Sequence, residues 1–198
     1  MYTAPDGKPR CDWCRTTPEY LDYHDREWGF PVSDDRRLFE KICLEGFQAG
    51  LSWRTILTKR ENFRRAFKQF DIDAVARFQK KDVDRLLQDP GIIRHQGKIE
   101  AAINNAQRAR ALIDEAGSLA AFFWRYEPDP SMLGAPQSMT TSPESIELSK
   151  ILKKKGWKFI GPTTVFAFMQ AMGLINDHVE GCITREQVSR ARAQFSKP

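Results

Sequence analysis

Residues that bind metal ions in proteins occur near both ends of the chain, and this restricts the fold more than any other feature of the sequence. The segment NDHVEGC, close to the C-terminus, contains His178 and Cys182 four positions apart. The segment CDWCRTTPEYLDYHDREWG, close to the N-terminus, contains Cys11, Cys14 and His24. A closed structural zinc site takes four Cys or His ligands, so two residues from each segment would complete one. The sequence therefore predicts a fold in which the two ends of the chain meet at a zinc ion.

The spacing of these residues leaves two choices for the N-terminal ligands. Cys11 and Cys14 form a CxxC, the commonest zinc spacing, so chemistry alone favours this pair together with His178 and Cys182. In that set His24 has no function. The alternative to any metal site is a hydrogen-bonded histidine among small buried thiols. A zinc ion that joins the chain ends would contribute on the order of 10 kcal/mol of apparent binding energy to folding.

Length and composition indicate one hydrophobic core. The chain has 198 residues, of which 41% are hydrophobic, enough for one sizeable core but too few for two independent domains. We expect a single domain over residues 1–198, with two helical lobes around one cleft. Lys and Arg number 31 against 26 Asp and Glu, and the net charge of +5 favours a polyanionic partner such as nucleic acid. A mildly basic surface that only confers solubility is the alternative.

Neither a signal peptide nor a membrane span is expected. The start, MYTAPDGKPR, has no apolar stretch, and the longest apolar run, around VFAFMQAMGLI, is too short and interrupted to span a bilayer. We therefore expect a protein of the cytoplasm or nucleoid with no membrane partner. In such a reducing compartment the four cysteines are better explained as metal ligands, buried residues or catalytic thiols than as disulfides. Cys43 lies on the apolar side of a predicted helix and is expected in the core.

Helical patterns run through almost the whole chain. The segment SDDRRLFEKICLEGFQAG begins with Ser33 as a helix cap and places Leu38, Phe39, Ile42 and Phe47 at helical spacing. Further helical segments follow: RENFRRAFKQF, DIDAVARFQ, KDVDRLLQ, KIEAAINNAQRARALIDEAG, SLAAFFWRYE, SPESIELSKILKKKG and TTVFAFMQAMG. The segment EPDPSMLGAPQSMTTSPES is rich in Pro, Ser and Thr, which predicts a long surface loop. The predicted fold class is therefore all-α.

Five separated segments of the sequence have a combined pattern that is typical of one enzyme family: YLDYHDREWG, LFEKICLEGFQAGLSW, GIIRHQGKI, KKGWKFIGPTT and MQAMGLINDHVEGC. In this order, and over nearly the full chain, they resemble DNA-3-methyladenine glycosylase I, a bacterial family that excises alkylated adenine. The resemblance implies a helix-hairpin-helix glycosylase fold with a structural zinc ion joining segments 11–24 and 178–182. It places the zinc ligands at Cys11, His24, His178 and Cys182, and it leaves Cys14 without a ligand role.

The substrate implied by the resemblance is 3-methyladenine in alkylated double-stranded DNA. Methylation at the N3 position makes the base positively charged, so the base leaves as a neutral molecule and its glycosidic bond is already weakened. The enzyme can then act mainly by extruding the base into a pocket that stabilises departure and positions water. We expect a monofunctional hydrolase that acts as a monomer in base excision repair and releases free 3-methyladenine.

The segment CLEGFQAGLSW contains the parts of such a pocket. Glu45 can accept hydrogen bonds from the adenine amine and ring edge, and Trp53 can stack on the base. The resemblance implies that both residues contact the base, and Glu45 is the catalytic candidate. Tyr20, Tyr23 and Trp28 are expected to complete the aromatic walls, where a desolvated cation–π contact is worth about 2 kcal/mol. Taken singly, these tryptophans would be core residues and Glu45 a solvated residue at a helix end.

Two other groups of residues are expected to contact DNA. Gln48 and Leu51 are candidates to fill the gap that the extruded base leaves in the duplex, although Leu51 could equally be a core leucine. In SKILKKKGWKFIGPTTVFAF a basic helix end precedes a hairpin and a second helix that begins at Pro162 or Thr163. Exposed backbone N–H groups and lysines there would bind DNA phosphates. The candidates are Lys158, Gly161, Thr163 and Thr164, and the alternative is a solvated lysine face at a helix end.

Other positions limit the chemistry. Many helix-hairpin-helix glycosylases have a catalytic aspartate where this chain has Asn176, followed by Asp177, and an amide cannot act as a general base. Lyase activity would need an amine of lowered pKa, for which Lys98 is a candidate without evidence of desolvation. The tail from Ile183 to Pro198 predicts a short amphipathic helix or a loose basic arm.

Two alternative functions use the same residues. A non-catalytic, zinc-stapled protein that binds damaged DNA would share the basic hairpin and the aromatic pocket, but it would have no need of Glu45. A zinc hydrolase would need three protein ligands and one open position, which a set of four ligands does not leave.

Overall fold

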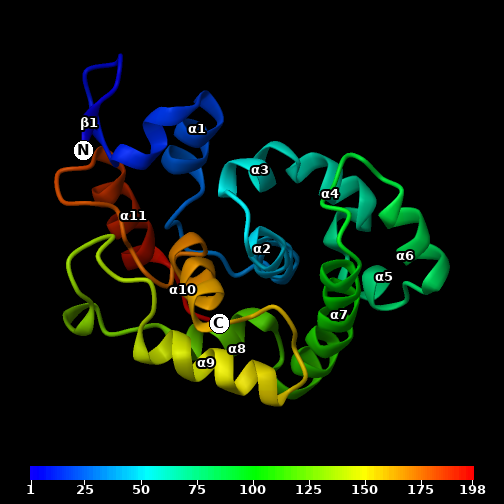
Figure 1. Ribbon diagram of the computed structural model, residues 1–198. Helices are drawn as coiled ribbons and strands as arrows, with labels where there is room; N and C mark the ends of the chain where they lie inside the picture. Colours follow the sequence, from blue (N-terminus) through cyan, green and yellow to red (C-terminus); the bar gives the residue numbers. More distant parts are fainter.

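The computed structural model describes residues 1–198, and helices make up nearly all of its regular structure, as the sequence predicts (Figure 1). The α-helices are α1 (Pro18–Arg26), α2 (Asp35–Gln48), α3 (Trp53–Thr58), α4 (Arg60–Ala66), α5 (Ile72–Ala76), α6 (Lys80–Leu87), α7 (Gln96–Ala116), α8 (Leu119–Phe123), α9 (Pro143–Lys154), α10 (Pro162–Ala171) and α11 (Ile183–Gln194). Four 3-10 helices are η1 (Asp12–Thr16), η2 (Lys68–Phe70), η3 (Trp124–Tyr126) and η4 (Pro130–Met132). The only strands, β1 (Tyr2–Thr3) and β2 (Pro9–Arg10), pair antiparallel. None of the helices has both the length and the apolar character needed to cross a membrane.

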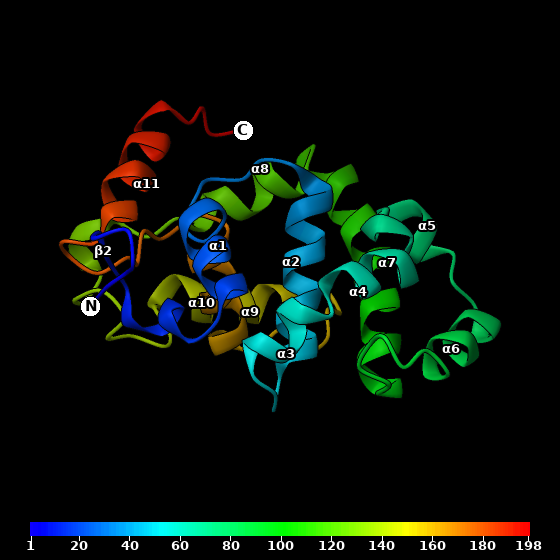
Figure 2. The same cartoon turned by 90° about the horizontal axis from the view of Figure 1, so that it is seen from above.

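Helix α2 lies at the centre of the molecule, and nine of its 14 residues are buried. Figure 2 shows α2 between α4 to α7 on one side and α1, α10 and α11 on the other. The Asp34 carboxylate caps α2 by accepting a hydrogen bond from the Arg37 backbone N–H over 2.8 Å. The prediction of Ser33 as the cap is therefore wrong by one residue. The shorter reach from Asp34 to the free amides of the first turn decides the position.

A group of phenylalanines joins the C-terminal half of α2 to α4 and η2. The Phe47 and Phe63 ring centroids are 4.7 Å apart, and the Phe67 and Phe70 rings stack at 5.6 Å. All four side chains are fully buried or nearly so. The apolar core continues from this group through α7, α8 and α10 as one connected cluster, which also includes the predicted core residue Cys43. The end of α2 is thus packed on several sides, and side chains that leave it have fixed positions.

Helices α9 and α10 pack against each other and are joined by a short hairpin turn. The turn between them buries Trp157 and Ile160, and the Ser149 hydroxyl donates to the Ile160 carbonyl over 2.7 Å. The amide side chain of Asn105, on α7, donates to the Lys158 carbonyl and accepts from the Lys158 backbone N–H, both over 2.9 Å. These contacts hold the turn against α7 and expose the Phe159 side chain. Helix α10 begins at Pro162, as predicted.

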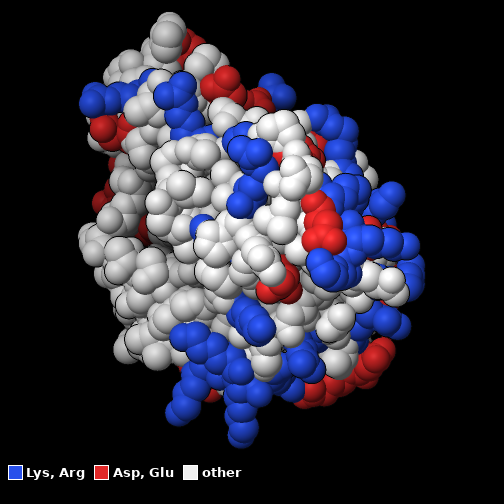
Figure 3. All heavy atoms as spheres, turned by 45° about the vertical axis from the view of Figure 1, so that its right-hand side comes forward, with Lys and Arg blue, Asp and Glu red and all other residues white.

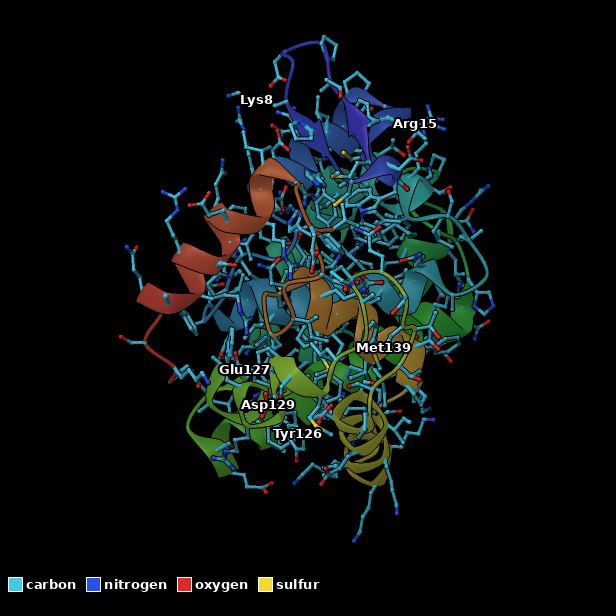
Figure 4. All side chains as sticks on the ribbon, turned by 90° about the vertical axis from the view of Figure 1, so that its left-hand side faces the viewer. Lys8, Arg15, Tyr126, Glu127, Asp129 and Met139 are labelled. Atoms are coloured by element: carbon cyan, nitrogen blue, oxygen red, sulfur yellow. The ribbon has the colours of Figure 1, made fainter.

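The last residues of the chain fold as an ordered helix rather than a loose arm. The Phe195 ring packs on Trp124 with centroids 4.6 Å apart, and Arg192 lies 2.5 Å from the Glu127 carboxylate, which also pairs with Lys197. Figure 4 shows the end of α11 near the segment that contains Glu127. This segment opens the predicted long loop, which has η4 as its only helix before Pro143. Helix α11 also contacts β2, so the C-terminal helix lies beside the N-terminal strands (Figure 1).

Candidate functional site

Two cysteines and two histidines meet where the chain ends come together. The ligand atoms of Cys11, His24, His178 and Cys182 all lie within 4.8 Å of one another, and all four residues are buried. His24 Nε2 is 3.1 Å from His178 Nδ1 and 3.5 Å from the Cys182 Sγ, and the Cys11 Sγ is 3.7 Å from His178 Nδ1. A hydrogen bond from the Cys11 thiol, together with both imidazoles, lowers the pKa of the Cys182 thiol well below its usual range. The group can therefore supply the thiolate and imidazole donors that metal ions bind.

The remaining ring nitrogens of the two histidines have partners of the kind found around protein metal sites. His24 Nδ1 lies 2.7 Å from the Asp25 carboxylate, and His178 Nε2 donates to the Trp28 carbonyl over 2.9 Å. Arg10 in turn binds Asp25 over 2.9 Å. Such contacts orient an imidazole so that its other nitrogen points at the metal. The donor set and its surroundings thus fit a tetrahedral metal ion.

The structure separates the two ligand sets that spacing alone left open. Cys14 is buried, but its thiol donates to the Cys11 carbonyl over 3.1 Å and it is not part of the four-residue group. His24 takes its place because α1 directs the imidazole toward Cys182. The set implied by the resemblance is therefore the one that the fold brings together, and the set favoured by the CxxC spacing is not.

An aromatic pocket of about 230 Å³ adjoins this group. The residues that line it are Trp13, Tyr20, Tyr23, Trp28, Lys41, Glu45, Gln48, Trp53, Ala167 and Gln170. The Trp28 ring lies 4.7 Å from the His178 ring, and Trp13 lies 5.3 Å from the His24 ring, so the metal-binding residues support one wall of the pocket. All five predicted base-contacting residues, namely Tyr20, Tyr23, Trp28, Glu45 and Trp53, line this one cavity.

Glu45 lies in the last turn of α2 and is paired inside the pocket. Its carboxylate is 2.8 Å from the Lys41 ammonium one helical turn earlier, and both side chains are buried. Lys41 also donates to the Tyr23 hydroxyl over 2.8 Å and lies 3.3 Å from the centroid of the Trp53 ring. Burial raises the pKa of Tyr23 well above its usual value, so this hydroxyl keeps its proton. The alternative of a solvated glutamate at a helix end is therefore excluded.

Gln48 lines the aromatic pocket, and both Gln48 and Leu51 lie beside the start of α10. A second hollow of about 180 Å³ is lined by both residues together with Glu45, Ala49, Gly50, Thr163, Thr164 and Ala167. The Leu51 side chain is 41% exposed, which excludes the alternative of an ordinary core leucine. Gly50 has a φ of +78°, and the turn that it forms lets Leu51 project from the end of α2.

The hairpin offers free backbone donors beside these residues. Gly161 is the N-cap of α10, no side chain caps this helix, and nothing lies within 4 Å of where a Gly161 Cβ would stand. A DNA phosphate could therefore approach the N-terminus of α10 closely. Lys158 is exposed on the same hairpin. Figure 3 shows Lys and Arg side chains along the lower edge and right side of the face it presents, beside an area with few charged groups.

Three residues considered as catalytic groups have structural roles. Asn176 donates to the Arg185 carbonyl and the Ser189 hydroxyl, both over 3.0 Å, and it does not line the pocket. Lys98 is buried, which lowers its pKa, but its ammonium donates to the Phe47 and Ala49 carbonyls over 2.9 and 2.6 Å. It therefore satisfies the C-terminal end of α2. Asp177 accepts a hydrogen bond over 2.6 Å from Gln170, which does line the pocket.

Four pocket residues were missed from the sequence: Trp13, Lys41, Ala167 and Gln170. The four-residue spacing between Lys41 and Glu45 was a usable signal, because residues at this spacing meet on a helix. Trp13 lies between the two cysteines of the CxxC, a motif that indicates metal binding and gives no signal for an aromatic pocket residue. Ala167 and Gln170 come from α10, and only the packing of α10 on α2 brings them to the site.

Comparisons with known proteins identify relatives that match most of this chain. The family model described as methyladenine glycosylase matches residues 13–186. The DNA-3-methyladenine glycosylase 1 of Escherichia coli is 49% identical over 87% of this chain and 95% of its own length, and the DNA-3-methyladenine glycosylase of Haemophilus influenzae is 45% identical over 87% and 96%. Among solved structures, a 3-methyladenine DNA glycosylase I has a TM-score of 0.82 at 50% identity and covers 88% of this chain and 98% of its own. The Staphylococcus aureus enzyme, whose study concerns the recognition of 3-methyladenine, has a TM-score of 0.84 at 39% identity, with coverage of 89% and 96%. The chain belongs to the methyladenine glycosylase family.

Proposed function

We propose that this protein is a monofunctional DNA-3-methyladenine glycosylase in which Glu45 recognises the extruded base inside the aromatic pocket. The observation that carries the proposal is a buried carboxylate on the wall of a cavity otherwise lined mainly by aromatic rings. The cavity of about 230 Å³ is smaller than pockets for drug-sized ligands, which start near 300 Å³. It suits a single base rather than a larger molecule.

The reaction breaks the bond between C1′ of deoxyribose and N9 of the methylated base. The electron pair of that bond goes to the base and cancels its positive charge. Positive charge develops on the sugar, water adds its oxygen to C1′, and one proton passes to solvent. The products are neutral 3-methyladenine and an abasic site in an unbroken strand. Since the leaving group is already activated, a pocket that binds and orients the base can supply most of the catalysis.

Each part of the pocket has a task in this proposal. Glu45 accepts hydrogen bonds from the exocyclic amine and the ring edge of the base. The rings of Tyr20, Tyr23, Trp28 and Trp53 stack on it and exclude water, and such stacking is worth about 1–3 kcal/mol per base.

DNA contacts come from the two segments beside the pocket. Leu51, exposed on the turn after α2, fills the gap in the duplex together with Gln48. Gly161, Thr163 and Thr164 present the N-terminus of α10 to a phosphate, and Lys158 adds attraction independent of sequence. The shared hollow between the two segments supports this arrangement, because a duplex that reaches one segment also reaches the other.

The metal in this proposal is one structural zinc ion. Cys11, His24, His178 and Cys182 would hold it, and when bound it supplies a fixed link between the chain ends. Four protein ligands leave no position for water, which argues against a zinc hydrolase. A single domain over residues 1–198 and a monomeric state stay predictions of the sequence.

Base release from alkylated duplex DNA tests the function. We expect chromatography to show free 3-methyladenine and gel analysis to show an intact strand until the abasic site is cleaved by alkali. Tight binding to alkylated DNA without base release would favour the non-catalytic alternative. Strand cleavage by the enzyme alone would contradict the monofunctional mechanism.

A further inference from the structure

Lys41 places a positive charge in the wall of a pocket that receives a positively charged base. Its ammonium is buried, and all three of its hydrogens have an acceptor or a π face: the Glu45 carboxylate at 2.8 Å, the Tyr23 hydroxyl at 2.8 Å and the Trp53 ring at 3.3 Å. Burial lowers the pKa of Lys41, whereas the Glu45 carboxylate opposes this change. A carboxylate and an aromatic face together favour the ammonium form.

The charges around the pocket are otherwise balanced in pairs. Glu27 and Arg60, the next charged groups that act on Lys41, bind each other over 2.7 Å. Glu45 is paired with Lys41 itself. Without Lys41, a buried and unpaired Glu45 would attract the cationic base before its bond to the sugar breaks. Binding that favours the ground state in this way does not accelerate the reaction.

The charge of the base changes during the reaction, so the electrostatic interaction between the base and Lys41 changes too. In the intact nucleotide the methylated base is a cation, and after the glycosidic bond breaks it is neutral. Lys41 lines the cavity together with Trp53, so a bound base lies near its ammonium. Even a base stacked on the Trp53 face opposite Lys41 would be only about 7 Å away, since a stacked ring adds about 3.5 Å to the 3.3 Å on the near side. Repulsion is therefore present in the ground state and vanishes as the base departs.

We propose that Lys41 determines specificity for the departing base: it disfavours the cationic base of the intact nucleotide relative to the neutral base that leaves. This inference rests on the proposed assignment of the pocket as the base site. It assigns to Lys41 a function that depends on its charge and needs no contact with the sugar. Glu45 reads the hydrogen-bonding edge of the base, while Lys41 offsets the attraction that this carboxylate would have for the charge of the base.

Two small ligands isolate this effect from catalysis. The permanently cationic 3,9-dimethyladeninium resembles the base before cleavage, because its N9 methyl group stands in for the sugar. Neutral 3-methyladenine resembles the base after cleavage. Dissociation constants for both, measured by quenching of tryptophan fluorescence, would be compared in wild type, Lys41→Met and Lys41→Arg. Met preserves most of the length and apolar stem of Lys, and Arg preserves the charge.

We expect Lys41→Met to bind the cation about tenfold more tightly relative to the neutral base than wild type does. Coulomb repulsion at about 7 Å in an effective dielectric near 20 corresponds to roughly fiftyfold, which is an upper limit because solvent at the pocket screens part of it. Lys41→Arg should keep the wild-type ratio. In single-turnover base release from alkylated duplex, Lys41→Met should lower the maximal rate without raising the enzyme concentration needed for half-maximal rate.

The outcomes separate this inference from the proposed function. A ratio of the two dissociation constants in Lys41→Met that equals the wild-type ratio would overturn the inference. This includes the case in which both ligands bind equally more weakly, which is what a purely structural role predicts. Failure of wild type to bind either base would instead contradict the proposed base site. Thermal unfolding of each variant, with and without 3-methyladenine, shows whether the pocket is folded.

Discussion

The Trp28 carbonyl accepts a hydrogen bond from His178 Nε2 over 2.9 Å, while the Trp28 ring forms part of the pocket wall. One residue therefore contacts both the metal-binding group and the proposed base site. The ring of Trp28 also packs edge-on against Trp13, with centroids 5.1 Å apart, and Trp13 contacts His24. Fixing the two end segments at the metal-binding group therefore also fixes the shape of the pocket.

Loss of a predicted zinc ligand should remove the metal and destabilise the fold. We expect His24→Ala to lose stoichiometric zinc and several kcal/mol of unfolding free energy, since a structural zinc site contributes on the order of 10 kcal/mol. Cys14→Ser is the matched control, because Cys14 is equally buried but outside the group. It should keep zinc in elemental analysis. Zinc retained in His24→Ala, or lost in Cys14→Ser, would show that the ligand set is wrong.

The ion pair between Glu27 and Arg60 should make stability depend on pH. Burial of Glu27 disfavours its charge, but two hydrogen bonds of 2.7 Å from Arg60 outweigh this and hold the pKa of Glu27 below its usual value of 4.5. The folded protein then prefers the ionised form, so the pair stabilises it above the unfolded pKa and less as pH falls through the folded pKa. We expect Glu27→Gln to cost about 2 kcal/mol at pH 7 in urea unfolding. The cost should shrink below pH 4, and a constant difference across this range would contradict the ionic explanation.

Leu51 should matter for DNA and not for folding. Its side chain is 41% exposed, so Leu51→Ala should change the unfolding free energy by no more than about 0.5 kcal/mol. Base release from duplex should fall about tenfold if the side chain fills the gap in the helix. Ile146→Ala is a control, because Ile146 is 51% exposed on α9, outside the hollow beside the pocket. Equal activities of the two variants would refute the wedge assignment.

Lys158 should contribute to binding through its charge alone. Lys158→Ala is expected to weaken binding to duplex of any sequence and to reduce the slope of log affinity against log salt by about 0.9. The control is Lys81→Ala on α6, another exposed lysine. Fluorescence anisotropy with unmodified duplex at several salt concentrations measures both slopes. If the slopes for Lys158→Ala and Lys81→Ala coincide, the hairpin is not a specific phosphate contact.

Much of the fold and site could be predicted from short-range patterns. Apolar spacing predicts α2, α7 and the α9–α10 unit, because burial of one helix face needs a period that the sequence must contain. The resemblance added the choice of His24 over Cys14, which spacing alone had wrong. That choice depends on where α1 directs an imidazole, and no local pattern encodes it.

The residues that prediction missed depend on long-range packing. Gln170 and Ala167 reach the pocket only because α10 packs on α2. Lys41 was missed because the C-terminal half of α2 is buried all round, from Lys41 to Phe47, although Arg36 and Arg37 in its first turns are exposed. The cap of α2 is Asp34 rather than Ser33; both residue types are good caps, so the sequence does not distinguish them, and the reach of the side chain to the first-turn amides decides the position.

The most direct test of the account is the rate of 3-methyladenine release by Glu45→Gln under single-turnover conditions on alkylated duplex. Gln keeps the size of Glu and removes only the negative charge and one acceptor. The account predicts a fall of about 10- to 100-fold, the worth of a hydrogen bond to a charged group, with zinc content and binding to unmodified duplex unchanged. Release at the wild-type rate would contradict the central claim, because the base would then be recognised without the Glu45 carboxylate.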